Sequence, residues 1–308
     1  MPFNTSVVEE FRANGGKVAG PFEGDDLLLL TTTGARSGKQ HTVALGYVRD
    51  GNRLLVVASA GGAPRHPAWY HNLLARPMVR VEIGTEAFEA IAVPAEGARR
   101  QELFDRILRV APGYADYQAG TARQLPVVAL ERAEADAAQP PQEVTNLAEK
   151  LLQVHTWLRG QLVQVRAEAD AHLAARAAHH GPGEAPPPGL GLQLRQHCLA
   201  FCQSLEFHHT GEDAHLFPEL GRHHPQLRGA LDRLRKEHET VGRINAELLA
   251  LLADIGSADP ERFRTELDKI SEELRVHLAF EEESLLPFLT EVPWPPAPPA
   301  ADAGGAPA

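Results

Sequence analysis

The chain has 308 residues, enough for two domains that each bury a core of their own. Its formal net charge of −11 and its isoelectric point of about 5.7 argue against a nucleic-acid-binding protein, because such proteins are normally basic. No apolar run reaches membrane-spanning length, and the first residues lack the pattern of a signal peptide. The two cysteines lie four residues apart in HCLAFC, which favours free thiols. We therefore expect a cytoplasmic protein, with peripheral membrane attachment left open.

The first part of the chain, residues 1–133, carries strand signals with a few helices between them. Apolar, β-branched runs bounded by turn residues predict strands at 25–33, 42–50, 53–59, 79–83, 86–95 and 127–130. Helices are expected at 4–13, 66–77 and about 96–110. Asp50-Gly51 predicts a hairpin turn. Many antiparallel strands with few helices indicate a small barrel in an α+β domain.

Strand signals disappear after residues 134–142, a stretch rich in Ala, Pro and acidic residues that is typical of a linker. Residues 143–291 predict an all-α four-helix domain. Its helices are expected at about 143–177, 192–215, 226–254 and 259–290, the second ending before Pro218, with a mobile Gly/Pro loop at 179–191. The Pro/Ala-rich tail, 292–308, is predicted to be disordered.

Two of these helices repeat one metal-binding pattern. His208 and Glu212, and then His277 and Glu281, each lie four residues apart, which places both side chains on one helix face. An imidazole and a carboxylate one turn apart can share a transition metal, although a single such pair is more often a solvated surface. The other two helices each add one histidine within an amphipathic pattern, at His155 and His238. Four such helices predict a di-metal site inside a bundle.

These residues resemble the hemerythrin-like (HHE cation-binding) domains, antiparallel bundles around a non-haem di-iron centre. The resemblance implies six ligands: His155, His208, Glu212, His238, His277 and Glu281. Glu212 and Glu281 would bridge the two irons. The second third-helix histidine of the oxygen carriers is replaced by Gly242, so either an iron position is open or another group, such as His209, substitutes. His197 and His209 are candidates for a supporting role.

Three stretches of the first domain suggest a ligand with an anionic tail. TTTGARSGKQHTVAL, residues 31–45, places glycines and two cations between strands, as in an anion cradle or a solvated basic turn. SAGGAPRHPAWYHNLLARP, residues 59–77, has glycines for close backbone approach and a helix start. Its Trp69 could stack on a flat ring or fill the core. APGYADYQAGTARQLPVV, residues 111–128, contains two tyrosines that could face a substrate or be structural.

Together the three stretches resemble the deazaflavin-dependent nitroreductase family, whose split β-barrels are flavin-reductase-like and bind reduced coenzyme F-420. The resemblance covers nearly all of residues 3–132. It assigns the coenzyme tail to Thr33, Arg36, Ser37, Lys39 and Thr42. It assigns the deazaflavin side to Ser59, Gly61, Gly62, Trp69 and Asn72, and the substrate pocket to Tyr114 and Tyr117. FMN is the alternative cofactor, since related barrels bind it.

The resemblances imply an oxidoreductase that passes a hydride from the reduced coenzyme to a quinone or a nitro compound. The metal domain would store iron, sense O₂ or NO, or take electrons from the barrel. The alternative is a sensor of O₂, NO or iron, or an iron-binding protein, in which the barrel only binds a flavin-like ligand. No nucleic-acid partner and no transmembrane segment are expected, and a homodimer is left open.

Overall fold

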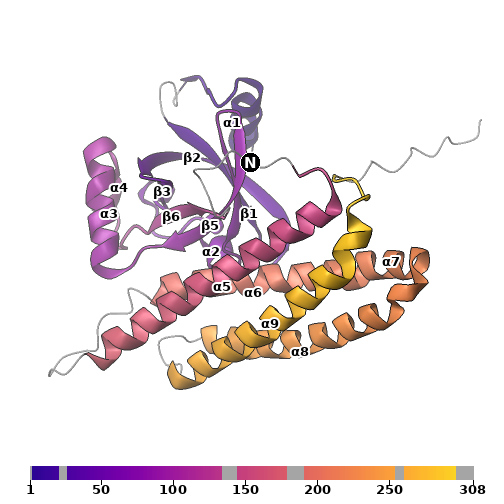
Figure 1. Ribbon diagram of the computed structural model, residues 1–308. Helices are drawn as coiled ribbons and strands as arrows, with labels where there is room; N and C mark the ends of the chain where they lie inside the picture. Colours follow the sequence, from indigo (N-terminus) through magenta and orange to yellow (C-terminus); the bar gives the residue numbers. More distant parts are fainter. Residues whose placement is uncertain (1, 21–25, 134–143, 179–190, 254–259, 296–308) are drawn as a thin grey trace, which may run out of the picture.

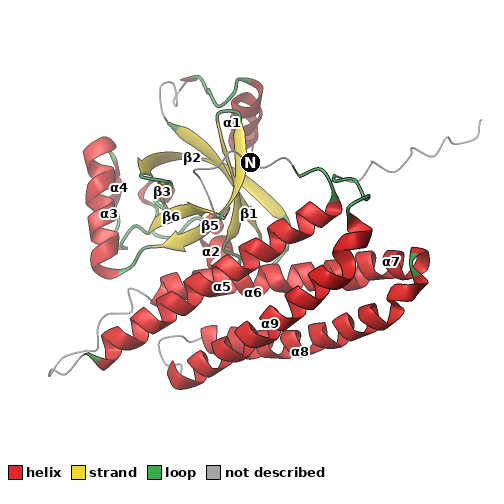
Figure 2. Ribbon diagram, viewed as in Figure 1, coloured by secondary structure: helices red, strands yellow, loops and turns green. Residues whose placement is uncertain are grey.

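A β-barrel and a group of long helices lie against each other in the computed structural model (Figure 1). The structure describes residues 2–20, 26–133, 144–178, 191–253 and 260–295. The predicted linker at 134–142, residues 179–190 of the predicted loop and residues 296–308 of the predicted tail lie outside this description. The expected α+β class, with a barrel followed by a helical bundle, is confirmed (Figure 2).

Six antiparallel strands form the barrel in the closed order β1-β2-β3-β6-β5-β4. Their bounds are β1 Leu27–Thr33, β2 Gln40–Asp50, β3 Arg53–Val57, β4 Met78–Ile83, β5 Glu86–Pro94 and β6 Val127–Arg132. Successive side chains of a strand point to opposite faces. In β1, Leu28 and Leu30 join the barrel core, while Leu27 and Leu29 pack under α1 (Pro2–Ala13). This double burial explains why β1 is an unbroken leucine run.

Three connections emerge at one end of the barrel. The β1–β2 loop follows Thr33, which pairs with Gln40. Because β2 and β3 are antiparallel, β3 ends on the same side, where Val57 pairs with Val127 at the start of β6. The β3–β4 connection holds the 3₁₀ turn Ala60–Gly62 and α2 (Ala68–Ala75). The β5–β6 connection holds α3 (Gly97–Val110) and α4 (Tyr114–Ala119). All three stretches singled out for ligand binding therefore meet at this end.

The second half consists of long helices around an apolar core. Their bounds are α5 Leu147–Ala177, α6 Gly191–Gly211, α7 Phe217–His223, α8 Arg228–Leu252 and α9 Pro260–Leu289. The predicted end of the second helix before Pro218 is wrong. The chain stays helical through a π-helical segment, Glu212–Leu216, and Pro218 lies in the first turn of α7, where its missing N–H is not needed. Within the described residues, no helix combines the length and apolarity that a membrane crossing requires.

Helix α6 joins the two halves. Its buried Gln196 donates hydrogen bonds to the carbonyl oxygens of Leu73, at 2.9 Å, and Ala92, at 3.1 Å. Ala200, also on α6, packs against Ile91 and Val93 of β5. The side chain of Gln196 is wholly removed from solvent, yet its amide nitrogen has two acceptors, as a buried polar group requires.

His197 lies beside this contact and joins three elements. Its Nδ1 is 2.7 Å from Glu168 of α5, and its Nε2 is 3.1 Å from Glu131 of β6. Burial acts to lower the pKa of His197, but the hydrogen bonds with Glu131 and then Glu168 outweigh it and raise this pKa to about 9. The same contacts outweigh burial at both carboxyls and lower their pKa values. At neutral pH the barrel and the bundle are thus joined through a charged, buried triad.

We predict that His197→Gln reduces the loss of unfolding free energy that the protein undergoes as pH rises from neutral to alkaline. A raised histidine pKa adds stability fully below about pH 6.5 and loses it as pH rises through about 9, a change of about 3 kcal/mol. The difference in unfolding free energy between wild type and variant, measured by urea denaturation, should therefore shrink between pH 6.5 and pH 10. The exposed His223→Gln is the control. A difference that stays constant over this range would contradict the prediction.

Candidate metal centre and coenzyme site

Seven metal-binding side chains from five helical segments converge in the bundle. They are His155 on α5, His208 and His209 at the end of α6, Glu212 at the start of the π-helical segment, His238 on α8, and His277 and Glu281 on α9. Six of the seven are buried, and His208 is nearly so. The extra residue in a π-helical turn is a frequent feature of functional sites, and here it directly follows the two α6 histidines.

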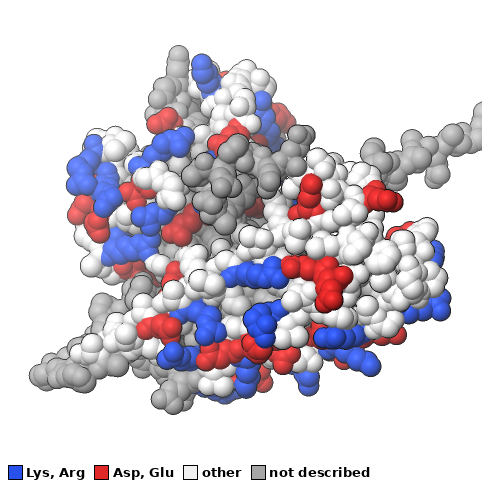
Figure 3. Space-filling view, in the orientation of Figure 1, with Lys and Arg blue, Asp and Glu red and all other residues white. Residues whose placement is uncertain are grey.

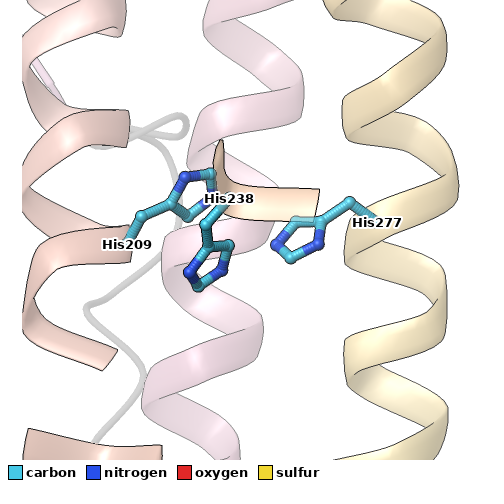
Figure 4. Close-up of side chains that lie close together, drawn as sticks. All are labelled: His209, His238 and His277. Atoms are coloured by element: carbon cyan, nitrogen blue, oxygen red, sulfur yellow. The ribbon is translucent and has the colours of Figure 1, made fainter. Parts of the chain in front are cut away.

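These side chains form two groups, each with ligand atoms within 4.8 Å of one another. One group contains His155, His208, Glu212 and Glu281, and the other contains His209, His238 and His277. The three imidazoles of the second group face one another between helices α6, α8 and α9 (Figure 4). The rings of His209 and His238 are stacked at 4.0 Å between centroids. The structure thus brings together all six ligands suggested by the sequence and adds His209.

Each carboxylate lies between the two groups. Glu212 places Oε1 3.4 Å from Nδ1 of His208 and Oε2 3.5 Å from Nε2 of His238. Glu281 places Oε2 3.4 Å from Nε2 of His155 and 3.5 Å from Nε2 of His277. Nitrogen and oxygen ligands bound at about 2.1 Å to one ion lie about 3 Å apart. The arrangement therefore suits two metal ions with two carboxylates between them.

Three further carboxylates, which the sequence analysis missed, lie behind the histidines. Glu282 is 2.8 Å from Nδ1 of His155, and Glu237 is 3.0 Å from Nδ1 of His277. Asp213 is 3.1 Å from Nδ1 of His238. A carboxylate hydrogen-bonded to Nδ1, as at His155 and His277, fixes the ring and leaves Nε2 as the metal-binding atom. Each of the three is the chain neighbour of a ligand, and this adjacency was the only sequence signal.

The cluster has too many unsatisfied buried polar atoms to be a finished hydrogen-bond network. Within the described residues, both oxygens of Glu212 and of Glu281, and Nε2 of His209, His238 and His277, have no hydrogen-bond partner. Such atoms are costly unless something binds them. Burial lowers the pKa of His208 to about 3, so its imidazole is neutral at pH 7, the form that binds metal. The donor set thus fits a cation that the neutral imidazoles and carboxylates would share.

The two alternatives at Gly242 can now be compared. Gly242 is exposed, and no described atom lies within 4 Å of the position that a Cβ would take. A side chain at this position therefore starts from the surface, whereas His209 lies in one group with His238 and His277. The geometry therefore favours substitution by His209. His197, the other candidate for a supporting role, is part of the junction with the barrel.

At the open end of the barrel, the β1–β2 loop presents two cations. The backbone closes on itself through hydrogen bonds between Gly34 and Lys39 and between Gly38 and Gly34. A Cβ at Gly34 would meet the Ser37 Oγ and lie 3.2 Å from the Lys39 carbonyl oxygen, so a larger residue would require Ser37 to turn away. Arg36 and Lys39 are exposed and, among the described residues, have no ion-pair partner. The loop can therefore receive an anionic group.

Asn72 of α2 holds this loop in place. Its Oδ1 accepts a hydrogen bond from the Ala35 amide at 3.1 Å, and its Nδ2 donates to the Thr32 hydroxyl at 3.1 Å. Thr42 supports the neighbouring strands through a 2.7 Å hydrogen bond with the Thr31 hydroxyl. Trp69, one turn before Asn72, is 6% exposed and packs in the barrel core. Its ring therefore offers little surface to a ligand.

The second loop, residues 58–63, is fixed by Arg123, which the sequence analysis did not single out. The Arg123 guanidinium donates hydrogen bonds to the carbonyl oxygens of Ala58, Ser59 and Ala63, at 2.6 to 3.1 Å. Gly62 has a φ of +80°, and a Cβ there would lie 3.2 Å from the Tyr117 carbonyl oxygen. Glycine thus permits the loop to rest directly on α4.

Helix α4 places two tyrosines beside that loop. The rings of Tyr114 and Tyr117 meet edge to face at 5.9 Å between centroids. Tyr117 is 44% exposed, whereas Tyr114 is partly buried beneath it. Helix α4 was not among the helices expected from the sequence. It places Tyr117 directly against the glycine loop at Gly62.

Comparisons with known proteins support both halves. Residues 4–132 match the family described as F420H(2)-dependent quinone reductase, and residues 146–289 match the hemerythrin HHE cation binding domain. F420H(2)-dependent quinone reductases from two Mycobacterium tuberculosis strains are 39% identical over 128 residues, which are 40% of this chain and 85% of theirs. A solved F420-H2 dependent reductase is 39% identical, covers 34% of this chain and 94% of its own, and has a TM-score of 0.33. A second solved structure, described as a domain-swapped dimer, is 36% identical, covers 41% of this chain and 93% of its own, and has a TM-score of 0.35.

The chain therefore belongs to the F420H(2)-dependent quinone reductase family through its barrel, and it carries a hemerythrin HHE domain in its helical half. Both resemblances noted in the sequence are confirmed. The reductase family implies coenzyme F-420, and the HHE domain implies a di-iron centre.

We predict that His209→Ala lowers the iron content of purified protein from two ions per chain toward one. His209 supplies one of three imidazoles in its group, whereas the other group keeps all four of its ligands. Iron per chain, measured by mass spectrometry of the metal, checks this, with the exposed His215→Ala as the control. Equal iron content in the two variants would show that His209 is not a ligand.

Proposed function

We propose that this protein is a coenzyme F-420-dependent oxidoreductase that passes a hydride to a quinone or nitro-type acceptor and holds two iron ions in its bundle. The observation that carries the reductase proposal is the meeting of three motif-bearing loops at one end of a closed barrel. The names of the mycobacterial relatives support a quinone as the acceptor. The proposed units are a reductase domain at 1–133, a linker at 134–142, a metal domain at 143–291 and a tail at 292–308.

The coenzyme tail is assigned to the β1–β2 loop. The exposed charges of Arg36 and Lys39, which have no ion-pair partner in the described part of the chain, attract its phosphate and carboxylates. Ser37, Thr33 and Thr42 add hydroxyls on and beside the same turn. Asn72 keeps this loop in position from α2. Ser59, Gly61 and Gly62 line the ring side, where Arg123 fixes the backbone. Trp69 supports that wall from within the core.

The two tyrosines are assigned to the acceptor. When bound, the reduced coenzyme supplies a hydride. The quinone takes up that hydride and one proton and leaves as the quinol. The hydroxyl of Tyr117 donates a hydrogen bond to the acceptor oxygen and can deliver the proton, which solvent restores because the side chain is 44% exposed. Tyr114 positions the Tyr117 ring from below.

In the bundle, we assign His155 and His208 to one iron and His209, His238 and His277 to the other. Glu212 and Glu281 lie between the groups and are assigned as shared ligands. Their charges and the neutral imidazoles match a pair of divalent or trivalent ions. O₂ and NO are the candidate ligands of this centre, and electron exchange with the barrel is its proposed role in turnover.

The test follows loss of the reduced coenzyme with menadione as the acceptor, in wild type and in the double variant Glu212→Gln, Glu281→Gln. Hydride transfer in the barrel predicts turnover by wild type, and the proposed electron exchange with the metal centre predicts turnover at least about tenfold slower in a folded, iron-free double variant. Lys17→Gln, an exposed change on the barrel, is the control.

Turnover that is equal in both proteins would confine the reaction to the barrel and end the proposal of electron exchange. Absence of both coenzyme binding and turnover in iron-loaded wild type would overturn the reductase proposal. A sensor, in which the barrel only binds a flavin-like ligand, would instead bind the coenzyme without oxidising it faster than the background reaction.

A further inference from the structure

Helix α6 contacts both sites with opposite ends. Its C-terminal end supplies His208 and His209 to the metal cluster. Its N-terminal half packs on α2, the helix that carries Asn72. In the mycobacterial relatives, 128 barrel residues make up 85% of the chain, which leaves no length for a bundle. The contact of α6 with α2 is thus a feature that this chain adds to the family's barrel.

The contact is directed at the end of α2. The last carbonyl groups of a helix lack partners within the helix and need donors from elsewhere. Here three side chains of α6 supply them. Arg195 donates to Leu74 O at 2.8 Å, Gln196 to Leu73 O at 2.9 Å and Gln203 to Ala75 O at 3.0 Å. The position of α2 therefore depends on the position of α6.

The other end of this chain of contacts reaches the loop proposed to hold the coenzyme tail. Asn72 lies directly before Leu73 and holds the loop through Ala35 N and the Thr32 hydroxyl. On the metal side, α6 is tied to α8 by the hydrogen bond from Asn245 Nδ2 to Cys202 O, at 3.0 Å. Direct hydrogen bonds thus connect α6, through α2 and Asn72, to the tail-binding loop.

We propose that α6 couples the two sites, so that metal in the bundle raises the affinity of the barrel for coenzyme F-420. The coupling rests on the functions proposed above for the two sites. Metal bound to His208 and His209 fixes the C-terminal end of α6, and Gln196, Arg195 and Gln203 then hold α2 and its Asn72 in the binding position. Linkage requires the converse as well, so that the coenzyme raises the affinity for iron by the same factor.

The experiment is an anaerobic calorimetric titration of oxidised coenzyme F-420 into metal-free and Fe(II)-loaded protein. We expect the Kd to fall by about fivefold or more on iron loading, the lower end of typical couplings between sites. The reciprocal titration of Fe(II), with and without the coenzyme, should give the same factor. Equal coenzyme Kd values in the two states would overturn the coupling.

Variants at the contact of α6 with α2 test whether the coupling passes through its hydrogen bonds. Gln196→Met keeps the length of the side chain and removes both hydrogen bonds, so the ratio of Kd values should approach one while each ligand still binds. If this buried change prevents folding, the half-buried Gln203→Met provides the same test at Ala75 O. The exposed Gln153→Met of α5 is the control and should keep the full ratio.

A full ratio in both junction variants would overturn the route through α2. Failure of the proposed functions gives a different result: wild type that binds no coenzyme in either state, or no Fe(II), overturns the corresponding site itself. Coupling is therefore judged only from two measured affinities, and each negative result identifies which proposal it removes.

Discussion

The structure depends on the double burial of helix α6. One side of the helix belongs to the bundle core, through Cys198, Phe201 and Leu205, and another side lies on β5 and α2 of the barrel. Where a helix is buried on both sides, its polar side chains lose access to water and need partners. Gln196 finds the carbonyls of Leu73 and Ala92, and His197 finds two carboxylates. These hydrogen bonds and ion pairs therefore fix the position of the bundle on the barrel.

The same constraint acts at the metal cluster but is not met there by protein atoms alone. Glu212 and Glu281 are buried beside five imidazoles, and burial raises the pKa of Glu212, with Glu281 adding to the effect. At Glu281, the neighbouring His155 and Glu212 side chains outweigh burial and lower the pKa. Two carboxyls with opposed shifts share one site, which is a high-energy arrangement without cations. Bound metal would remove that cost, and His208 and His209 connect it to α6.

Charged side chains of both signs are interspersed over the visible surface (Figure 3), so the buried cluster differs sharply from the exterior.

The periodicity of the α-helix allowed part of this site to be predicted from the sequence. Pairs four residues apart identified His208 with Glu212 and His277 with Glu281, because a helix alone brings such residues together. Asp213, Glu237 and Glu282 could not be assigned in this way, since their partners lie on other helices. His209 was left open because it is the chain neighbour of His208, and one helix face does not normally hold both. The helix end predicted before Pro218 was wrong because a π-helical turn lets the helix continue. The contacts of Gln196 and His197 with the barrel could not be predicted from the sequence, because they depend on how the two domains pack together.

Hydrogen–deuterium exchange of the whole chain, before and after Fe(II) loading of metal-free protein, tests most directly whether one helix serves both sites. The account predicts slower exchange in α6 and also in α2 and residues 34–39 of the barrel. Helix α1, which packs on Leu27 and Leu29 of β1, should not change. Slower exchange confined to α5 through α9 would contradict the account, because the metal cluster would then be independent of the coenzyme loops.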